Sequence, residues 1–445
     1  MFSAPAPHLV AALCDPAHAG AALGEPERPG RADLAWAASG AMALTGEAAG
    51  PPLLAPAPLA GAAARALGCL TELAWQPERL DFDAAALLGE RAACFGFARA
   101  GQSAAGARCR LLRAAQGWLA VHLARDDDVA ALPAWLECEP EPFAWERLAA
   151  RVARRDASAL VARARLLGMP ISPAAVPPRS DVPWCRIAAR GTPRVRPPEV
   201  RPRVVDLTSL WAGPLCTHLM ERAGGDVVKV ESRSRPDGAR RGDARFYALL
   251  NHGKRSVALD FSDENDRRAL HRLLRGADIV VESSRPRALL QLGIDAERLV
   301  RECPGLTWVG ITGHGRAAPQ RDWIAFGDDA AAAGGLCQAT GGAQRPLFCG
   351  DAVADPLTGL YAAVAGLAAH RAGGGVLVDL ALADVISHLV ARPAGSRVAR
   401  VVSDVDGDFV EWAGDRVPVA PPRARAPDGA AAALGADTAK VLAAC

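Results

Sequence analysis

The sequence has 445 residues, enough for two or three domains with a large core. Half of the residues are hydrophobic and 51 basic side chains nearly balance 49 acidic ones, which argues against a nucleic-acid-binding or membrane-surface protein. The 11 cysteines lack metal-type spacing, and neither a signal sequence nor a membrane-spanning apolar run is evident, so we expect a cytoplasmic protein with reduced thiols and no metal site.

Residues 1–189 have only a weak apolar pattern, which predicts a mostly helical region. Helical or mixed segments are expected at residues 60–73, 80–93, 111–126 and 146–167. The next stretch, residues 190–203, is rich in proline and arginine and has no apolar periodicity. Such a composition is typical of an extended linker, so we place the main domain boundary there.

Residues 204–395 alternate short apolar strands with helical segments. Strands are expected at 203–207, 226–231, 256–260, 278–282 and 306–311, and helices at 212–222, 266–274 and 286–292. This alternation predicts an α/β fold with a doubly wound, Rossmann-like parallel sheet, accompanied by a second, smaller and mostly helical α/β domain from the first region. Ligands of such sheets bind at the carboxyl ends of the strands, but no dinucleotide motif follows the first strand.

The C-terminal tail, residues 396–445, predicts little regular structure. Two short strands are expected at 408–412 and 416–420, followed by a final helix at 438–444.

A faint internal repeat links the two halves of the chain. Residues 58–68 and 356–366 share a Pro-Leu-x-Gly start and a second glycine at the same distance. The residue before the proline is Ala57 in the first copy and Asp355 in the second. Glycine and alanine are so abundant in this chain that composition alone also produces such a match.

Asp355 is the candidate catalytic residue. It stands where a glycine-rich loop meets an apolar helix, so one interpretation is a helix N-cap followed by Pro356 at the first helical position. The other is a nucleophilic carboxylate that attacks an activated acyl group. The two roles are compatible, because a capping position would hold the carboxylate still.

Lysine is rare in this chain. Only Lys229, Lys254 and Lys440 occur among the 51 basic residues, and the others are arginines. Lysines that persist in such an arginine-rich composition are candidates for a role that needs a compact ammonium group.

Six motifs of the second half occur together, in the order and spacing of a known family. They lie at residues 204–214, 224–231, 251–260, 277–286 and 310–315 and in the stretch around Asp355. They resemble the family III CoA-transferases, the superfamily of formyl-CoA transferase, carnitine CoA-transferase and alpha-methylacyl-CoA racemase. Residues 36–40, 115–121 and 167–173 resemble a degenerate copy of the later half of that family. The chain thus resembles two copies with complementary losses: the small domain from the first, and the sheet and aspartate from the second.

The resemblance implies a CoA-transferase that moves CoA from an acyl-CoA donor to a carboxylic-acid acceptor through Asp355. Asp355 would attack the donor thioester to give a mixed anhydride, and the CoA thiolate would return to form an aspartyl-CoA thioester. The resemblance further implies CoA as a substrate, no permanently bound cofactor, and a homodimer. Two alternatives stay open: an acyl-CoA racemase or isomerase, and a non-catalytic CoA-binding relative.

Further site residues follow from the motifs and from the physical needs of this chemistry. The oxyanion and acyl pocket is assigned to Trp211, Ala212, Gly213 and Gly359, and CoA binding to Lys229, Lys254, Arg255, Arg285, Arg287 and His314. The competing interpretations are ordinary ones: glycines that serve turns and packing, a core tryptophan, solvated surface arginines and a turn histidine.

The chain departs from the family pattern at several positions. Trp211 stands where some members carry glutamine, which disfavours a small polar acid such as oxalate. Phe326 lies near the position of the racemase histidine, which disfavours a two-base racemase. Asp328 and Asp329 are expected to be solvated or to cap a helix, since adjacent side chains point apart. Residues 101–106 are the only counterpart of the glycine-rich loop of the small domain.

Overall fold

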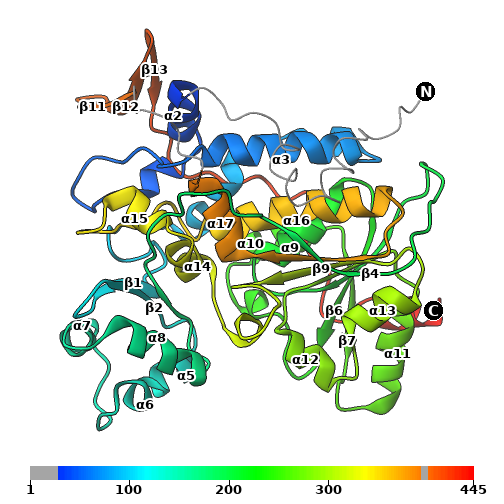
Figure 1. The fold of residues 1–445 in the computed structure, drawn as a ribbon. Coiled ribbons are helices and arrows are strands. Elements are labelled where there is room, and N and C mark those ends of the chain that lie inside the picture. The colour runs from blue at the N-terminus through cyan, green and yellow to red at the C-terminus, as the bar shows by residue number, and fades with distance from the viewer. Residues whose placement is uncertain (1–28, 392–398, 445) are drawn as a thin grey trace.

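A seven-stranded sheet lies at the centre of the computed structural model, which describes residues 29–391 and 399–444 (Figure 1). In spatial order its strands are β4 (Arg186–Arg190), β10 (Val376–Ala381), β9 (Thr307–Thr312), β8 (Ile279–Glu282), β5 (Arg203–Leu207), β6 (Asp226–Ser232) and β7 (Arg255–Leu259). All neighbours are parallel except β4, which pairs antiparallel with β10 at one edge. The predicted doubly wound α/β fold is therefore confirmed.

The strand order reverses between β5 and β8. The chain runs outward from β5 through β6 to β7 on one side, and from β8 through β9 to β10 on the other. The loops that follow β5 and β8 meet at this reversal, where the Ser209 N–H donates to Ser283 Oγ at 3.2 Å. Doubly wound sheets bind their ligands at this point, at the carboxyl ends of the strands.

Helices cover both faces of the sheet (Figure 1). One face carries α3 (Leu59–Leu73), α9 (Ala212–Arg222) and α16 (Ala354–Arg371), and the other carries α11 (Glu264–Arg275), α12 (Pro286–Gln291) and α13 (Ala296–Glu302). Nearly every residue of α16 is buried, so this helix has no polar face and lies at the centre of the larger core. Gly366 lets this helix come close to its neighbours, because a Cβ there would lie 2.5 Å from Met220 Cε.

The predicted smaller domain is also present. It consists of the antiparallel sheet β1 (Cys109–Arg113), β2 (Trp118–His122) and β3 (Ile171–Pro173) with α5 (Asp126–Ala130), α6 (Leu132–Leu136), α7 (Trp145–Val152) and α8 (Ala157–Leu166). It has its own apolar core, in which the buried Trp135 donates its indole N–H to the Leu160 carbonyl at 2.9 Å. With four helices and three short strands, the domain is mostly helical, as expected from the sequence.

The remaining elements connect and close these two parts. They are α2 (Pro29–Ala38), α4 (Glu90–Phe95), α10 (Ala244–Asn251), α14 (Gly327–Ala333), α15 (Leu336–Gly341), α17 (Leu382–Val390), α18 (Thr438–Ala443) and the sheet of β11 (Arg400–Asp404), β12 (Gly407–Trp412) and β13 (Asp415–Pro418). The predicted strand pair and final helix of the tail are confirmed, while β11 was not predicted.

The two helices of the sequence repeat, α3 and α16, pack side by side (Figure 1). The first half also contributes β4 to the large sheet, so both halves of the chain build one core. Of the predicted linker at 190–203, residues 191–202 contain no helix or strand, while Arg190 ends β4 and Arg203 begins β5. Among the described helices, none combines the length and apolarity needed to cross a bilayer.

Candidate active site

Asp355 lies in the first turn of α16. The helix begins at Ala354 with Val353 as its N-cap, so the predicted capping role of Asp355 is wrong, and Pro356 is third rather than first in the helix. A carboxylate in the first turn is still stabilised by the helix dipole, by about 0.3–1 kcal/mol. Asp355 as a residue is partly exposed, whereas its neighbours in this turn are buried.

The loop before Asp355 is held by side chains from other segments. Thr45 Oγ1 accepts the Gly350 N–H at 2.8 Å, and Asp328 Oδ1 accepts the Ala352 N–H at 3.1 Å. Ala352 has a φ of 44°, a left-handed conformation that is uncommon outside glycine. Such a conformation persists only where the surroundings determine it, so the loop presents Asp355 in one fixed position.

Gly327, the first residue of α14, lies directly against the Asp355 carboxylate. A Cβ added to Gly327 would be 2.3 Å from Asp355 Oδ2 and 2.7 Å from the Ala352 carbonyl oxygen. Only glycine allows so close an approach of the backbone. The Gly327 N–H has no hydrogen-bond acceptor among the described residues, so it is free to donate to a reacting group.

Arg91 faces the carboxylates of this region. Arg91, from α4 in the first half, donates from Nε to Asp351 Oδ2 at 2.9 Å and from Nη2 to Asp351 Oδ1. Burial opposes its charge, but Asp351, Asp328 and Asp355 together raise the pKa of Arg91. The guanidinium therefore stays charged and partly neutralises the carboxylates around it.

The environment of Asp355 changes its acidity. Burial raises the pKa of Asp355 to about 7, Asp328 and Asp351 add to the rise, and Arg91 and His122 oppose it. A carboxylate with this pKa is ionised in a substantial fraction of molecules at neutral pH. It is also poorly solvated and more basic than an exposed carboxylate, which favours nucleophilic attack.

A histidine–aspartate pair lies next to this group. The Asp329 carboxylate interacts with His122 Nδ1 at 3.2 Å, and it accepts the Ser172 hydroxyl at 3.1 Å and the Phe326 N–H at 2.8 Å. The His122 ring lies 4.8 Å from the Phe326 ring, and its Nε2 has no partner among the described residues. The capping prediction is thus confirmed for Asp329, but the solvated alternative is wrong, because Asp328 and Asp329 are both buried.

Trp211 is the N-cap of α9 and lies beside the carboxylate cluster. It is buried, its ring packs edge-on against Phe246 at 5.3 Å, and the Arg91 guanidinium carbon lies 5.0 Å from its centroid. The predicted core and pocket-lining roles therefore both agree with its position.

The predicted oxyanion donors fall into two groups. A Cβ on Gly359 would be 2.7 Å from the Ala212 carbonyl oxygen, and one on Gly213 would be 2.3 Å from Thr208 Cβ, so both glycines serve close packing. Gly359 lies in the second turn of α16, where its N–H belongs to the helix ladder, and the geometry does not support it as a donor. Ala212 and Gly213 lie in the first turn of α9, and their N–H groups have no acceptor among the described residues.

Lys254 is fully engaged inside the protein. Its Nζ lies 2.7 Å from Thr217 Oγ1, 2.9 Å from the Pro214 carbonyl, 3.0 Å from Asp206 Oδ2 and 3.1 Å from Asn251 Oδ1. Three N–H groups thus face four acceptors. Burial alone would raise the pKa of Asp206, but Lys254 and Lys229 hold it at about 2. This arrangement leaves no donor for a CoA phosphate.

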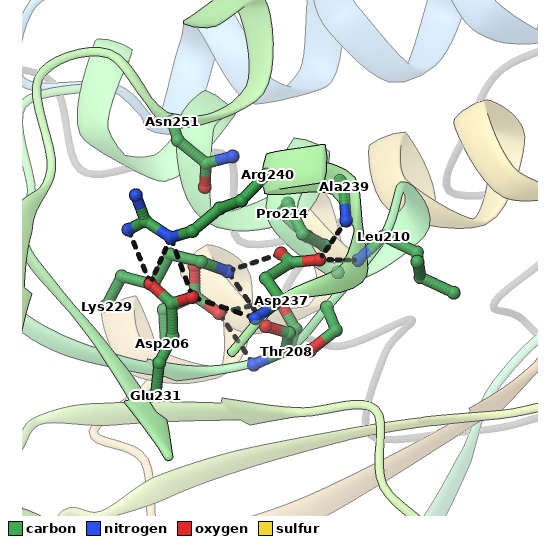
Figure 2. Close-up of polar contacts among 12 residues, drawn as sticks. Asp206, Thr208, Leu210, Pro214, Lys229, Glu231, Asp237, Ala239, Arg240 and Asn251 are labelled. Atoms are coloured by element: carbon green, nitrogen blue, oxygen red, sulfur yellow. Dashed lines mark hydrogen bonds and ion pairs between the residues drawn. The ribbon is translucent and has the colours of Figure 1, made fainter. Parts of the chain in front are cut away.

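Lys229 is buried in the same polar network (Figure 2). Its Nζ donates to the Thr208 carbonyl at 2.8 Å and pairs with Asp237 Oδ2 at 3.0 Å. Asp237 in turn accepts the Leu210 N–H at 3.0 Å. The network therefore holds the loop that leads into Trp211, and the geometry favours this structural role over the predicted binding of CoA.

Replacing Lys254 by methionine is expected to destabilise the protein by about 3–5 kcal/mol at pH 7, because Asp206 would lose its buried counter-ion. Urea unfolding measures this loss, and Lys440→Met, on the exposed side of α18, serves as the control with a change within about 0.5 kcal/mol. A stable Lys254→Met protein with a raised KM for the CoA ester would instead restore the phosphate-binding role.

The three arginines predicted to bind CoA lie at two opposite edges of the sheet. Arg255 begins β7 and pairs with Asp226, the first residue of β6, at 2.6 Å. This is the amino edge of the sheet, opposite Asp355, so the geometry does not support Arg255 as a CoA ligand. Arg285 and Arg287 are exposed after β8 at the carboxyl edge, with no ion pair among the described residues.

Further cations surround Arg285. Burial lowers its pKa, and Arg287, Arg125 and Arg235 lower it further. Asp322 opposes this lowering, and Arg125 is already paired with Asp128. Arg285, Arg287 and Arg235 have no ion pair among the described residues, and guanidinium groups of this kind suit a phosphate.

His314 faces the small domain. Its ring lies 5.5 Å from that of Trp323, over which the Arg165 guanidinium of α8 stacks at 3.4 Å. Burial lowers the pKa of His314, Asp329 opposes this and Arg165 adds to it. It therefore lies between the two domains, near the histidine–aspartate pair.

Sequence reasoning missed Arg91, His122 and Gly327. Arg91 is one arginine among many, so its residue type carried no signal. His122 directly follows the quoted motif at 115–121, and a polar residue at the end of an apolar strand was the available clue. Arg91 and His122 become visible only when the first half packs against the second, and Gly327 only when α14 packs against the N-terminus of α16.

Comparisons with known proteins identify the family of the chain. Residues 202–444, more than half of the chain, match CoA-transferase family III. Succinate–glutarate CoA-transferase of Agrobacterium fabrum is 32% identical over 218 residues, which cover 45% of this chain and 54% of the relative. Formyl-CoA:oxalate CoA-transferase of Rhodopseudomonas palustris is 32% identical over 199 residues, which cover 42% of this chain and 47% of the relative.

The chain spans about half the length of the curated relatives it matches. Among solved structures, a CAIB/BAIF family protein from Brucella suis is 28% identical, with a TM-score of 0.41, over 48% of this chain and 65% of that chain. The match over residues 202–444 includes every strand of the large sheet except β4, together with α9 and the Asp355 helix. The chain therefore belongs to CoA-transferase family III.

Proposed function

We propose that this protein transfers CoA between an acyl-CoA donor and a carboxylic-acid acceptor through covalent intermediates on Asp355. The observation that carries the proposal is the carboxylate of a partly exposed residue, with a pKa of about 7, placed where two helix N-termini meet in a matched family region. Neither the donor nor the acceptor acid follows from this observation.

The proposed reaction has four balanced steps. An Asp355 oxygen attacks the donor thioester carbonyl, the C–S bond breaks, and CoA leaves as a thiolate. The thiolate attacks the Asp355 carbonyl of the mixed anhydride and releases the donor acid as a carboxylate. The acceptor carboxylate then attacks the aspartyl-CoA thioester and expels the thiolate again. Attack of this thiolate on the acceptor acyl carbonyl gives the new CoA ester and regenerates Asp355.

Two features support the developing oxyanions. Gly327 of α14 lies against the Asp355 carboxylate, Ala212 of α9 lies against Gly359 of α16, and the N–H groups of Gly327, Ala212 and Gly213 have no acceptors among the described residues. Free first-turn N–H groups stabilise negative charge in the transition state better than in the ground state.

The CoA ester is proposed to place its phosphates at the basic cluster of Arg125, Arg235, Arg285 and Arg287. These guanidinium groups lie around the loop after β8, on the same edge of the sheet as the N-terminus of α16. Arg285 and Arg287 were predicted for this role, while Arg125 comes from the small domain. The homodimer implied by the family resemblance remains a proposal that sedimentation analysis would test.

Gly327→Ala is expected to lower kcat/KM by about 10²-fold, because the added methyl displaces the Asp355 carboxylate. Gly68→Ala is the matched control, since a Cβ there meets no atom within 4 Å and lies in helix α3. This control should keep its activity and gain about 0.5–1 kcal/mol of stability. An active Gly327→Ala enzyme would show that Asp355 is not confined as described.

Turnover tests the proposal directly. The protein is incubated with a panel of acyl-CoA donors and free carboxylic acids, and new CoA esters are followed by mass spectrometry. At least one donor–acceptor pair is expected to exchange CoA in wild type and not in Asp355→Asn. Binding of CoA esters without exchange in any pair would favour a non-catalytic relative.

A second candidate function, α-proton exchange in the manner of a racemase, is favoured by His122. Phe326 lies near the position of the racemase histidine, which disfavoured a racemase from the sequence. In the structure, however, the His122 ring from the first half packs against the Phe326 ring. Incorporation of deuterium into the α-carbon of an acyl-CoA, without an acceptor acid, would support this function. Loss of that exchange in His122→Asn with retained CoA transfer would separate the two activities.

A further inference from the structure

Four aromatic side chains gather beside the candidate nucleophile. The aromatic cluster consists of Phe95, Phe97, Trp211 and Phe246. The Trp211 and Phe246 rings meet edge-on at 5.3 Å, Phe95 and Phe246 at 6.1 Å, and Phe95 stacks on Phe97 at 5.4 Å. The first half of the chain supplies two of these rings and the second half supplies the other two.

Arg91 connects the aromatic cluster to Asp355. Its guanidinium carbon lies 5.0 Å from the Trp211 centroid and 5.8 Å from the Phe97 centroid, while its nitrogen atoms bond Asp351. Arg91 is close enough to lower the pKa of Asp355. The aromatic cluster therefore lies within the same site as the nucleophile.

Part of this apolar surface is exposed. Phe95 is 42% exposed and Leu210, next to Trp211, is 43% exposed with a φ of 73°. Both side chains lie along the segment 238–242. A Cβ on Gly242 would lie 3.7 Å from the Phe95 ring, and a Cβ on Gly238 would lie 3.5 Å from the Leu210 side chain. Large apolar groups that stay accessible beside a functional group mark a binding surface.

The charges of the site disfavour a second carboxylate on the substrate. Asp328 and Asp351 lie close enough to Asp355 to raise its pKa, and Arg91 beside them is already bonded to Asp351 in a bidentate pair. A dicarboxylic acyl group would bring another negative charge to these carboxylates, and Arg91 is already engaged by Asp351.

We propose that the acyl group transferred at Asp355 is an apolar, ring-sized monocarboxylic acyl group that packs on the aromatic cluster. The inference rests on the proposed function and adds the class of substrate to it. Aromatic rings favour edge-on and stacked contacts with a second ring, which a short aliphatic chain cannot supply. The acceptor is of the same class, because it passes through the same acyl position on Asp355.

The test measures acylation by three CoA esters in the absence of an acceptor. Phenylacetyl-CoA, butyryl-CoA and succinyl-CoA are mixed separately with the full-length protein, and the mass of the Asp355 peptide is followed with time. The second-order rate constant for modification of Asp355 by phenylacetyl-CoA is expected to exceed that for butyryl-CoA by about 10-fold and that for succinyl-CoA by about 100-fold or more.

Phe95→Ala provides the matched variant, because an exposed side chain can be shortened without unfolding the protein. The ratio of phenylacetyl-CoA to butyryl-CoA rates is expected to fall at least about fivefold. Phe143→Ala is the control: its side chain is also 42% exposed, but it packs on Trp145 in the small domain, and the ratio should not change.

The outcomes separate the substrate class from the proposed function. Equal acylation by succinyl-CoA and phenylacetyl-CoA would overturn the substrate class and leave the transferase function standing. An equal fall for all donors in Phe95→Ala would assign Phe95 a structural role and overturn its part in selectivity. No acylation by any ester would overturn the transferase function and this inference with it.

Discussion

Asp355→Asn is expected to lower kcat for CoA transfer by roughly 10⁴-fold, because the amide cannot form the anhydride or the aspartyl thioester. The fold should persist, since no described hydrogen bond depends on the Asp355 carboxylate. Steady-state kinetics with the best donor–acceptor pair and far-ultraviolet circular dichroism measure the two effects. A variant that retains more than about a tenth of the activity would remove Asp355 from the mechanism.

The same substitution is expected to stabilise the protein at high pH. Burial raises the pKa of Asp355 from 3.8 to about 7 in the folded protein, so its ionisation costs folding free energy as the pH rises through that range. Asp355→Asn should match the wild type near pH 4 and exceed it by at most about 4 kcal/mol above pH 7. Urea unfolding at both pH values measures this. A constant difference across the range would contradict the raised pKa.

Wild-type acylation should depend on pH for the same reason. The ionised form of Asp355 is the proposed nucleophile, so the rate is expected to rise with pH and level off above about 7. Stability and activity therefore change in opposite directions over one pH range, as expected for a catalytic group that is costly to bury.

Arg91→Met is expected to have the second large effect, a loss of about 3–5 kcal/mol of stability at pH 8. The substitution leaves the fully buried Asp351 without its bidentate partner. It also removes the cation that lowers the pKa of Asp355, so the acid limb of the pH–rate profile should move to higher pH.

Two comparisons sharpen this prediction. Arg301→Met breaks only an exposed pair with Glu297 at 4.0 Å, and a change within about 0.5 kcal/mol is expected. Arg91→Lys keeps the positive charge but loses the two-pronged guanidinium that bonds both Asp351 oxygens. Compared with Arg91→Met, it should therefore recover the wild-type pH–rate profile more fully than the wild-type stability. An unshifted profile in Arg91→Met would mean that Arg91 and Asp355 are not coupled.

The sequence predicted most of the large sheet but missed its edge. β10 is buried at every position and follows three glycines, and a short apolar run of this kind does not distinguish a strand from a buried helix. β4 alternates exposed and half-buried residues in an Arg/Ala-rich segment, and only its pairing with β10 makes it a strand.

The candidate site was predicted in part, and the reasons differ from residue to residue. The Asp355 motif and the Trp211 loop are local patterns, so the sequence located them. Lys254 was assigned to CoA because a sequence shows a charge and not its partner, and here Asp206 is the partner. Arg91 comes from 264 residues upstream of Asp355, and only the packing of the two halves brings it to the site.

Capture of the acylated residue tests the central claim most directly. The protein is mixed with an acyl-CoA donor and then with hydroxylamine, and peptides are sequenced by mass spectrometry. The account predicts a hydroxamate at Asp355 in wild type and none in Asp355→Asn. A hydroxamate at another residue, or turnover with an unmodified Asp355, would contradict it.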